Sequence, residues 1–184
     1  MNWLTTFNDA KDQSAKTRKP ILLQFEMENC GGCKKLYAET YRDQQVQDEM
    51  QQWFVMLKLD LIKDREMRRD LAAYWTPSFY VLDHKGKSYY HFNGYLPPVD
   101  FRVMLRLGLA EAWIPRGRYD ETVNALSQDV DSLSDSALVP TLLKQRAIAD
   151  YIKTKDKNIF RGTMKDIRET YPDSLEAGMY FWQD

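Results

Sequence analysis

The sequence predicts an α/β domain, built on a central mixed sheet flanked by helices, followed by an all-α extension. Over residues 1–115, short apolar runs typical of buried strands alternate with segments of helical periodicity, the pattern of a sheet covered by helices. A turn signal at 84–86, where Gly86 supplies a positive φ, adds an antiparallel pair. No strand signal follows Pro115-Arg116-Gly117. We therefore predict one domain over 1–115 and a helical extension over 116–184.

The first part of the α/β domain is predicted from apolar spacing. Residues 3–18 place Trp3, Phe7, Ala10 and Ser14 on one stripe, which predicts a helix that Pro20 ends. The apolar run 21–25 is typical of a buried strand. A helix is expected from residue 33 onward and a second, short one over 44–52. The mostly apolar segment 54–61 is predicted to be a central strand.

The second part continues the alternation. Residues 64–74 carry Met67, Leu71 and Tyr74 at i, i+4 and i+7, which predicts a helix that ends before Pro77. Strands are expected over 78–83 and 87–92, on either side of the turn at 84–86. Pro97 and Pro98 lead into a helix over 99–114. The predicted order is α-β-α-α-β-α-β-β-α.

The extension is predicted to be four short helices. They cover 119–130, 137–153, 158–171 and 174–182, with a polar break at 132–136 that is expected to cap a helix. The apolar spacing is close to that of a tetratricopeptide (TPR) repeat, on Tyr151, Phe160, Met164, Ile167 and Pro172. Two interpretations stay open. The extension is either a TPR-like hairpin that binds a protein partner, or a helical cap packed on the first domain.

Composition excludes several classes of protein. The chain has 184 residues, 43% hydrophobic and 29% charged, with a net charge of −1, which is ordinary for a globular protein. Such a balance predicts no nucleic-acid partner. No apolar run approaches the ~20 residues that span a bilayer, so no membrane insertion is expected. The N-terminal segment lacks the apolar region of a signal peptide. We expect a cytoplasmic protein, or a periplasmic or secreted one if a signal peptide has been removed.

The two cysteines carry the most information. Cys30 and Cys33 are spaced C-x-x-C directly after a predicted strand, with a helix starting at the second. The first sulfur then lies at a helix N-terminus, where unpaired N–H groups and the helix dipole favour the thiolate. Lys34 adds positive charge, whereas Glu26 and Glu28 oppose it, so Glu26 and Lys34 are candidate modulators. We predict that Cys30 is the exposed nucleophile and Cys33 the more buried resolving thiol.

The cysteine pair could also belong to a metal site. A zinc or iron–sulfur half-site needs two more ligands from another chain, because only two cysteines exist. The histidines lie in a predicted turn (His84) and an edge strand (His91), so we interpret them as surface residues. No Gly-rich dinucleotide fingerprint is present. We therefore expect neither a metal nor a bound cofactor.

Several segments around the cysteines resemble the thioredoxin superfamily, in particular its disulfide-reductase-like branch. The resemblance covers residues 3–114 and rests on segments 19–25, 30–35, 43–46, 55–60, 76–83 and 92–95, with Gly86 in the turn. It implies a thioredoxin-like fold. It also implies that Pro77 is the family's cis-proline beside the C-x-x-C. Thr76 and the Gly94 region would then help form a groove that takes an extended substrate segment by backbone pairing.

The remaining predicted substrate-binding residues adjoin these. Asn29, Gly31 and Gly32 flank the cysteines, and Trp75 precedes Thr76. Trp75 has two equally weighted interpretations, a groove residue or a core residue. For all of these residues, substrate binding is a prediction.

The sequence also departs from the family pattern. Asn29 stands where the family has Trp, and Gly32 where it has Pro. The buried acid that classical thioredoxins use as a proton acceptor falls at Gln24, which cannot titrate. Glu26 is a candidate substitute as a proton shuttle. These departures put thioredoxin-like reducing efficiency and substrate choice in question.

Two functional hypotheses follow. The first is a thiol–disulfide oxidoreductase that reduces or exchanges protein disulfides, in which Cys30 attacks, Cys33 resolves and an external dithiol reductant restores the pair. Its partners are a disulfide-containing protein and that reductant, and its role is redox homeostasis. The alternative is a non-catalytic interaction module with a thioredoxin fold.

Overall fold

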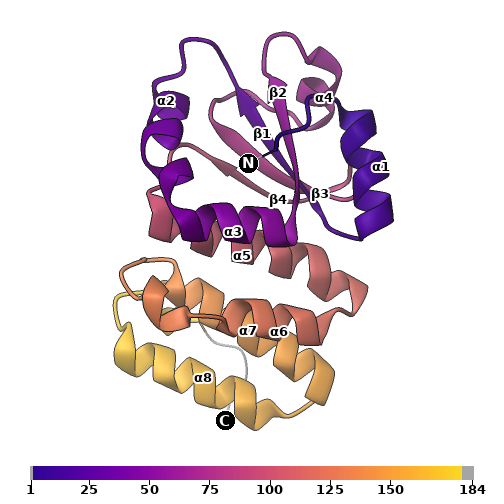
Figure 1. Cartoon of the computed structure of the whole chain (residues 1–184). Coiled ribbons are helices and arrows are strands. Elements are labelled where there is room, and N and C mark those ends of the chain that lie inside the picture. Colours follow the sequence, from indigo (N-terminus) through magenta and orange to yellow (C-terminus); the bar gives the residue numbers. More distant parts are fainter. Residues whose placement is uncertain (1, 180–184) are drawn as a thin grey trace.

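The computed structural model of the chain describes residues 2–179. A four-stranded sheet in the order β2-β1-β3-β4 is covered by helices on both faces (Figure 1). Strand β1 (Ile21–Glu26) pairs parallel with β2 (Val55–Asp60) and antiparallel with β3 (Ser78–Leu82). Strand β4 (Ser88–Asn93) pairs antiparallel with β3. The predicted mixed sheet and order of elements are confirmed.

The prediction that β2 is central is wrong, because β1 and β3 are the inner strands of the sheet and β2 lies at one edge, next to β1. The outer edge of β2 is covered instead by the N-terminal segment. Leu4 forms an isolated parallel bridge there, donating to the Met56 carbonyl at 2.9 Å and accepting from the Lys58 N–H at 2.9 Å. This cover explains why an edge strand is almost as apolar as a central one.

The same bridge shortens the first helix. Helix α1 is Phe7–Thr17, not 3–18, because Leu4 is extended and the Thr6 hydroxyl caps the helix by accepting from the Asp9 N–H at 3.2 Å. Trp3 therefore packs on the core from outside the helix.

The other helices of the α/β part follow the predicted order. They are α2 (Gly31–Ala38), α3 (Gln44–Trp53), α4 (Arg65–Asp70) and α5 (Pro98–Trp113). Helix α4 ends four residues earlier than predicted. Ala72 has a left-handed backbone with φ of 50°, which breaks the helical run. Tyr74 consequently leaves the apolar stripe and is 74% exposed.

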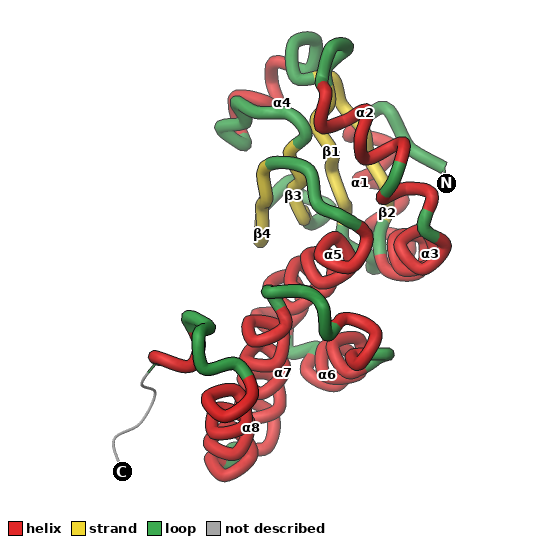
Figure 2. Tube along the Cα trace, turned by 90° about the vertical axis from the view of Figure 1, so that its left-hand side faces the viewer, coloured by secondary structure: helices red, strands yellow, loops and turns green. Residues whose placement is uncertain are grey.

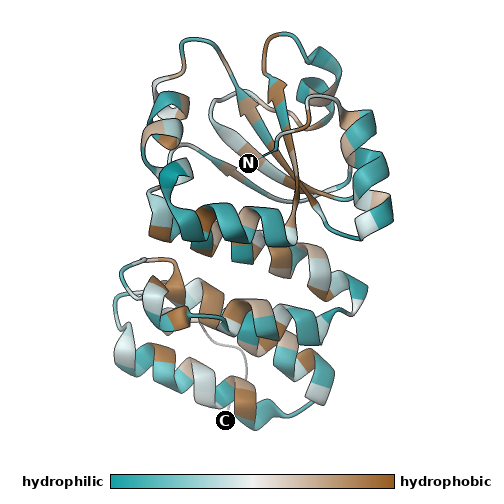
Figure 3. Cartoon of the chain, in the orientation of Figure 1, coloured by the Kyte–Doolittle hydropathy of each residue, from teal (hydrophilic) through white to brown (hydrophobic). Residues whose placement is uncertain are grey.

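Two apolar layers enclose the sheet, as the alternation of side chains in its strands requires. Leu23 and Leu57 face the layer that contains α1 and α4. Leu22 and Phe79 face the other layer, which contains α3 and α5. Figure 3 shows the hydrophobic strands between helices whose outer surfaces are hydrophilic.

Helix α5 approaches the sheet closely through Gly108. A Cβ added there would lie 2.6 Å from Val81 Cγ2, a distance that real Cβ atoms essentially never show. In a helix interior Ala is normally favoured over Gly by about 1 kcal/mol. Overpacking costs about 1–3 kcal/mol, so Gly108→Ala is expected to lower the free energy of unfolding measured in urea. Gly162→Ala in helix α8 (Lys157–Thr170) is the control, because its added Cβ meets nothing within 4 Å. Equal effects of the two changes would contradict the close approach.

The extension packs beneath α5 (Figures 1 and 2). It consists of α6 (Tyr119–Ser127), α7 (Val139–Thr154) and α8, with 3₁₀ turns at Ile114–Arg116 and Val130–Leu133. The helix predicted over 174–182 is wrong for its described part, where only a 3₁₀ turn, Glu176–Gly178, forms. Glu176 is buried, and its carboxylate lies 3.1 Å from Lys144 Nζ of α7. This ion pair holds the 3₁₀ turn against α7. Residues 180–182 lie outside the described residues.

The hydrophobic core is continuous across residue 115. Leu126 and Leu142 of the extension belong to the same apolar cluster as Phe101 and Leu105 of α5. Helices α7 and α8 form a hairpin with a smaller cluster of their own around Phe160. The division at residue 115 and the TPR-like character stay predictions. Among residues 2–179, no helix combines the length and the apolar character needed to cross a membrane.

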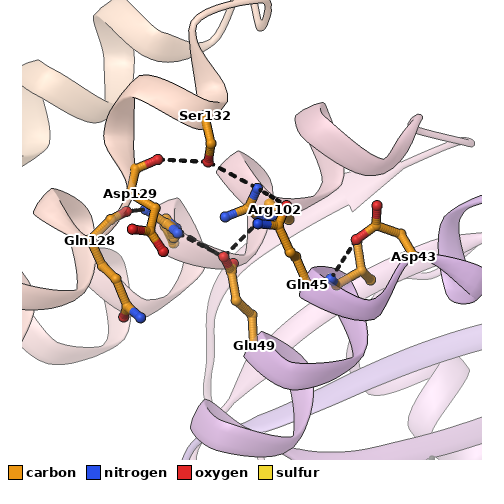
Figure 4. A network of polar contacts seen from close by, with 9 residues as sticks. Asp43, Gln45, Glu49, Arg102, Gln128, Asp129 and Ser132 are labelled. Carbon is orange, nitrogen blue, oxygen red and sulfur yellow. Dashed lines mark hydrogen bonds and ion pairs between the residues drawn. The ribbon is translucent and has the colours of Figure 1, made fainter.

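A buried charge cluster, Glu49, Arg102 and Arg106, joins α3 and α5 to the extension. Figure 4 labels Glu49 and Arg102 of this cluster, together with Gln128 and Ser132 of the extension. The Glu49 carboxylate accepts from Arg102 Nε at 2.8 Å and from Arg106 Nη2 at 2.7 Å. Arg106 also donates to the carbonyl of Gln128, and Arg102 to the hydroxyl of Ser132 at 3.2 Å. All three charged side chains are at least 92% buried. The cluster therefore ties the loop after α6 to the α/β part by charge-assisted hydrogen bonds.

Candidate active site

The cysteine pair lies where β1 ends and α2 begins. Cys30 is the N-cap of α2, and its Sγ accepts a hydrogen bond from the Cys33 backbone N–H at 3.0 Å. The two cysteines form a disulfide with their Cα atoms 5.2 Å apart. In the reduced state the same N–H and the positive end of the helix dipole stabilise a thiolate on Cys30. Lys34, next to Cys33, is exposed in the same turn.

The prediction that Cys30 is the exposed member of the pair is wrong. Cys30 is 6% exposed and Cys33 is 4% exposed, so burial does not distinguish them. Cys30 caps a helix, and the capping position brings its sulfur against the backbone of the first turn. What distinguishes the two sulfurs is therefore the hydrogen bond to Cys30 and not access to solvent.

A cleft of about 630 Å³ opens beside both cysteines. The loop after β1, the first turns of α2 and the segment after β2 form its walls. Three of the predicted site residues, Glu26, Asn29 and Lys34, line it with the two cysteines. Both cysteines therefore border this cleft.

The proline segment closes the other side of the pair. The Thr76–Pro77 peptide bond is cis, and Pro77 is buried. Its ring lies against Gly32, where an added Cβ would be 2.8 Å from Pro77 Cδ. The Gly94 N–H donates to the Pro77 carbonyl at 2.8 Å, and Gly94 has φ of 110°. The structure thus brings Gly32, Pro77 and Gly94 together beside the cysteines, with Thr76 half-buried.

The other predicted substrate-binding residues are at the surface. Asn29 and Gly31 are exposed, and Trp75 is 56% exposed. Of the two interpretations of Trp75, the core one is therefore wrong. Trp75 and its neighbour Tyr74 present aromatic surface next to the Thr76–Pro77 segment, and the groove interpretation of Trp75 stays a prediction.

The contact between Gly32 and Pro77 gives a prediction with a matched control. Gly32→Ala is expected to lower the free energy of unfolding by about 1–3 kcal/mol, because the new methyl group overlaps the proline ring. Gly31→Ala has nothing within 4 Å of its new Cβ and is expected to leave that free energy unchanged or slightly higher. Urea denaturation of both variants measures the difference. A harmless Gly32→Ala would mean that Pro77 does not abut the C-x-x-C turn.

A buried polar pair close to this site joins Gln24 of β1 to Tyr41, which lies in the 3₁₀ turn after α2. Gln24 on β1 is fully buried, and its Oε1 accepts from the Tyr41 hydroxyl. Its Nε2 has no hydrogen-bond partner in the part of the chain that the structure describes. Burial raises the pKa of Tyr41 well above its ordinary value. The position that an acid occupies in classical thioredoxins therefore holds only groups that do not ionise near neutral pH.

Glu26 is one of three residues with a carboxylate, together with Glu28 and Asp60, that line the cleft beside the cysteine pair. Its Oε2 accepts from the Tyr37 hydroxyl at 2.5 Å and lies 3.9 Å from Lys58 Nζ. Burial, and next the hydrogen bond to Glu26, raise the pKa of Tyr37, so Tyr37 remains a donor. Lys58 also lies over the rings of Trp3 and Tyr37, at 5.2 and 4.8 Å from their centroids. These contacts hold Glu26 on the wall of the cleft.

Four residues that line the cleft were not predicted to lie near the cysteines: Met27, Tyr37, Ile62 and Lys63. Asp60 also lines the cleft, as its place at the end of a strand predicted. Tyr37 is four residues after Cys33, a spacing that puts two helical side chains on one face. Asp60 ends β2, and parallel strands bring their C-terminal ends to one edge, here the edge where Cys30 follows β1. Backbone N–H groups of Lys63 and Ile62 lower the pKa of Asp60. Both signals were present in the sequence.

The histidines take no part in this site. His91 is exposed and stacks on Tyr80 with ring centroids 5.8 Å apart, and His84 lies in the turn between β3 and β4. Within residues 2–179 no group of three or more His, Cys, Asp or Glu side chains is arranged to hold a metal ion.

Fold and site together define a class: a four-stranded mixed sheet with a C-x-x-C pair at a helix N-terminus and a cis-proline beside it. Residues 7–108 match the family described as the thioredoxin-like domain, which is more than half of the chain. The chain belongs to this family, and the resemblance seen in the sequence is confirmed. No curated protein sequence matches the chain.

Several solved structures are similar to this chain at low identity, and the first of them shows the same fold. A thioredoxin from Thermus thermophilus is 20% identical, with a TM-score of 0.53, and the match covers 58% of this chain and 85% of that one. A Fasciola hepatica thioredoxin is 18% identical, with a TM-score of 0.47, and the match covers 59% and 99% of the two chains. The oxidised C-terminal domain of Neisseria meningitidis DsbD is 18% identical, with a TM-score of 0.46, covering 54% and 93%.

Proposed function

We propose that the chain is a thiol–disulfide oxidoreductase that reduces or exchanges protein disulfides through Cys30 and Cys33. The observation that carries this proposal is the hydrogen bond from the Cys33 backbone N–H to Cys30 Sγ at the start of α2. It singles out Cys30 as the sulfur whose thiolate is stabilised. Membership of the thioredoxin-like family supports the same function.

The reaction needs two exchanges. The Cys30 thiolate attacks one sulfur of the substrate disulfide, forms a mixed disulfide and releases the other substrate sulfur as a thiolate. Cys33 then loses its proton and attacks Cys30 Sγ. This forms the Cys30–Cys33 bond and releases the second substrate thiolate. Two electrons pass from the cysteine pair to the substrate, and an external dithiol reductant returns them.

The proton that leaves Cys33 needs an acceptor. Gln24 cannot serve, since a neutral amide does not titrate in this range. Glu26 is the group we assign to this step, because it lines the cleft that both cysteines line and is held there by Tyr37 and Lys58. Lys34 at the mouth of the cleft adds positive charge that favours the thiolate.

The substrate segment is proposed to bind along the Pro77 side. Thr76 and Gly94 flank Pro77 there, and Asn29, Trp75 and the C-x-x-C glycines are proposed as the rim. A disulfide in an extended, accessible stretch of protein fits this arrangement. The helical extension is proposed as a surface for a further protein partner, and the cytoplasm as the place of action.

Trapping of the mixed disulfide tests the proposal. In Cys33→Ser the second exchange cannot occur, so a mixed disulfide with a disulfide-containing peptide is expected to accumulate. Excess dithiol is expected to reduce this covalent complex to its two components. Cys30→Ser is the matched control and is expected to form no complex. A complex that forms equally well, or not at all, with both variants would refute the assignment of Cys30 as the nucleophile.

A non-catalytic interaction module is the second candidate. The burial of both sulfurs and the neutral Gln24 favour it. It predicts that a partner protein binds equally to the wild type and to Cys30→Ser.

A metal-bridged dimer, in which two such pairs share an ion, is tested by elemental analysis of the purified protein for zinc and iron.

A further inference from the structure

A second cavity, of about 560 Å³, lies at the opposite end of β1 from the cysteines. Cys30 follows the last residue of β1, whereas Lys19 and Pro20, which line this cavity, precede its first residue. The end of α1, the turn after β3, the end of α5 and the start of α6 complete the walls. Figure 1 shows the C-terminal ends of α1 and α5 at the same edge of the molecule. The cavity thus sits where the extension joins the α/β part.

Two short basic segments meet at this cavity from distant parts of the chain. The first segment, which follows α1, contains Arg18 and Lys19. The second, between α5 and α6, contains Arg116 and Arg118. Arg118 Nη1 donates to the Arg18 carbonyl at 3.3 Å, which ties the two segments together. The fold therefore gathers four basic side chains around one cavity.

The acidic residues at the cavity neutralise only part of this charge. Asp83 pairs with Arg116 at 3.1 Å, and Glu121 pairs with Arg118 at 3.1 Å. The Arg18 guanidinium has neither an ion pair nor a hydrogen bond within residues 2–179. Lys19 Nζ, close by, donates only to the neutral carbonyl of Gln51 at 2.9 Å. Among the Lys, Arg, Asp and Glu side chains of the lining, two positive charges therefore have no carboxylate partner.

A buried donor in the wall also lacks a partner. Trp113, which lines the cavity, is 93% buried, and its indole Nε1–H makes no hydrogen bond with the described residues. Buried donors are nearly always paired in native proteins. The Arg118 guanidinium lies over the Trp113 ring at 4.3 Å, so the charge and the unpaired donor are next to each other. Trp113 is therefore the wall residue whose indole N–H is expected to respond when the cavity is filled.

We infer that this cavity binds a small molecule carrying at least two negative charges on phosphate or carboxylate oxygens. Guanidinium groups pair with such oxygens in fork geometry, which favours an oxyanion over a halide. The cavity volume is within the range of small-molecule sites. Because the ligand would contact both α1 and the start of the extension, binding should also stabilise their junction. This inference does not depend on the redox function.

Titration of the full chain with pyrophosphate, and separately with citrate, tests the inference. The readout is the indole N–H signal of Trp113 in a ¹H–¹⁵N spectrum, assigned by its loss in Trp113→Phe or through nuclear Overhauser contacts if that variant does not fold. A saturable downfield shift of this signal is expected. The stronger of the two ligands identifies phosphate or carboxylate as the natural group.

Matched variants separate a site from general attraction. Arg18→Gln is expected to weaken binding by about tenfold, as for loss of one charge-assisted contact. Lys155→Gln is the control, because Lys155 is also a basic, exposed residue that ends a helix with a left-handed backbone, φ of 61° against 60° for Arg18. It should bind as the wild type does, and Cys30→Ser likewise. Absence of a saturable shift at Trp113, or equal weakening by Arg18→Gln and Lys155→Gln, would overturn the inference.

Discussion

Cys30→Ser is expected to reduce the rate of catalysed disulfide reduction to the uncatalysed rate. Serine keeps the size of the side chain but has no thiolate at neutral pH, so the first exchange has no nucleophile. The backbone N–H of Cys33, 3.0 Å from the Cys30 sulfur, then has nothing to activate. The rate is measured as release of thiols from a disulfide-bonded protein in the presence of a dithiol reductant.

A fold control belongs to this experiment. The Cys30→Ser variant should retain the circular dichroism spectrum of the reduced wild type, because Cys30 makes its only described side-chain hydrogen bond as an acceptor and the serine hydroxyl also accepts. Residual turnover above a tenth of the wild-type rate in the folded variant would remove Cys30 from the mechanism.

Glu49→Gln is expected to lower the free energy of unfolding by about 3–5 kcal/mol, the cost of leaving buried charge without its partner. Glu49 is the carboxylate that accepts from both Arg102 and Arg106, which are 2% and 0% exposed. A glutamine keeps the shape but leaves two buried guanidinium groups without a counter-charge. Urea denaturation of the full chain measures the loss.

An exposed ion pair provides the control for Glu49. Glu169 lies 3.8 Å from Lys165 on the surface of α8, and exposed pairs contribute about 0–1 kcal/mol. Glu169→Gln should therefore change the free energy of unfolding little. Similar losses for the two variants would contradict the view that Glu49 joins the extension to the α/β part through buried charge.

Most of the fold follows from the sequence, and the misses have physical causes. Apolar runs identified β1, β2 and β3, because a largely buried strand leaves a local pattern, and the turn at 84–86 identified β4 as the return strand. The bridge at Leu4 left no such pattern, since a single extended residue has no periodicity. The early end of α4 depends on one backbone angle, that of Ala72, and alanine carries no sequence signal for a left-handed conformation.

The part of the site that belongs to a sequence motif was predictable. Cys30, Cys33 and Pro77 were found from spacing and resemblance, and the structure places them together. The burial of Cys30 was missed, because exposure depends on segments distant in sequence. No local pattern in the sequence marks Arg102 and Arg106 as buried, because their burial depends on Glu49, which comes from another helix.

The midpoint potential of the Cys30–Cys33 pair tests the proposed function most directly. The full chain is equilibrated in graded mixtures of oxidised and reduced dithiol, and free thiols are trapped and counted. We predict a reversible two-electron transition between about −270 and −120 mV, the range of thiol–disulfide exchange proteins. A pair that stays reduced throughout, or that cannot be reduced again once oxidised, would contradict the proposal and favour the interaction module.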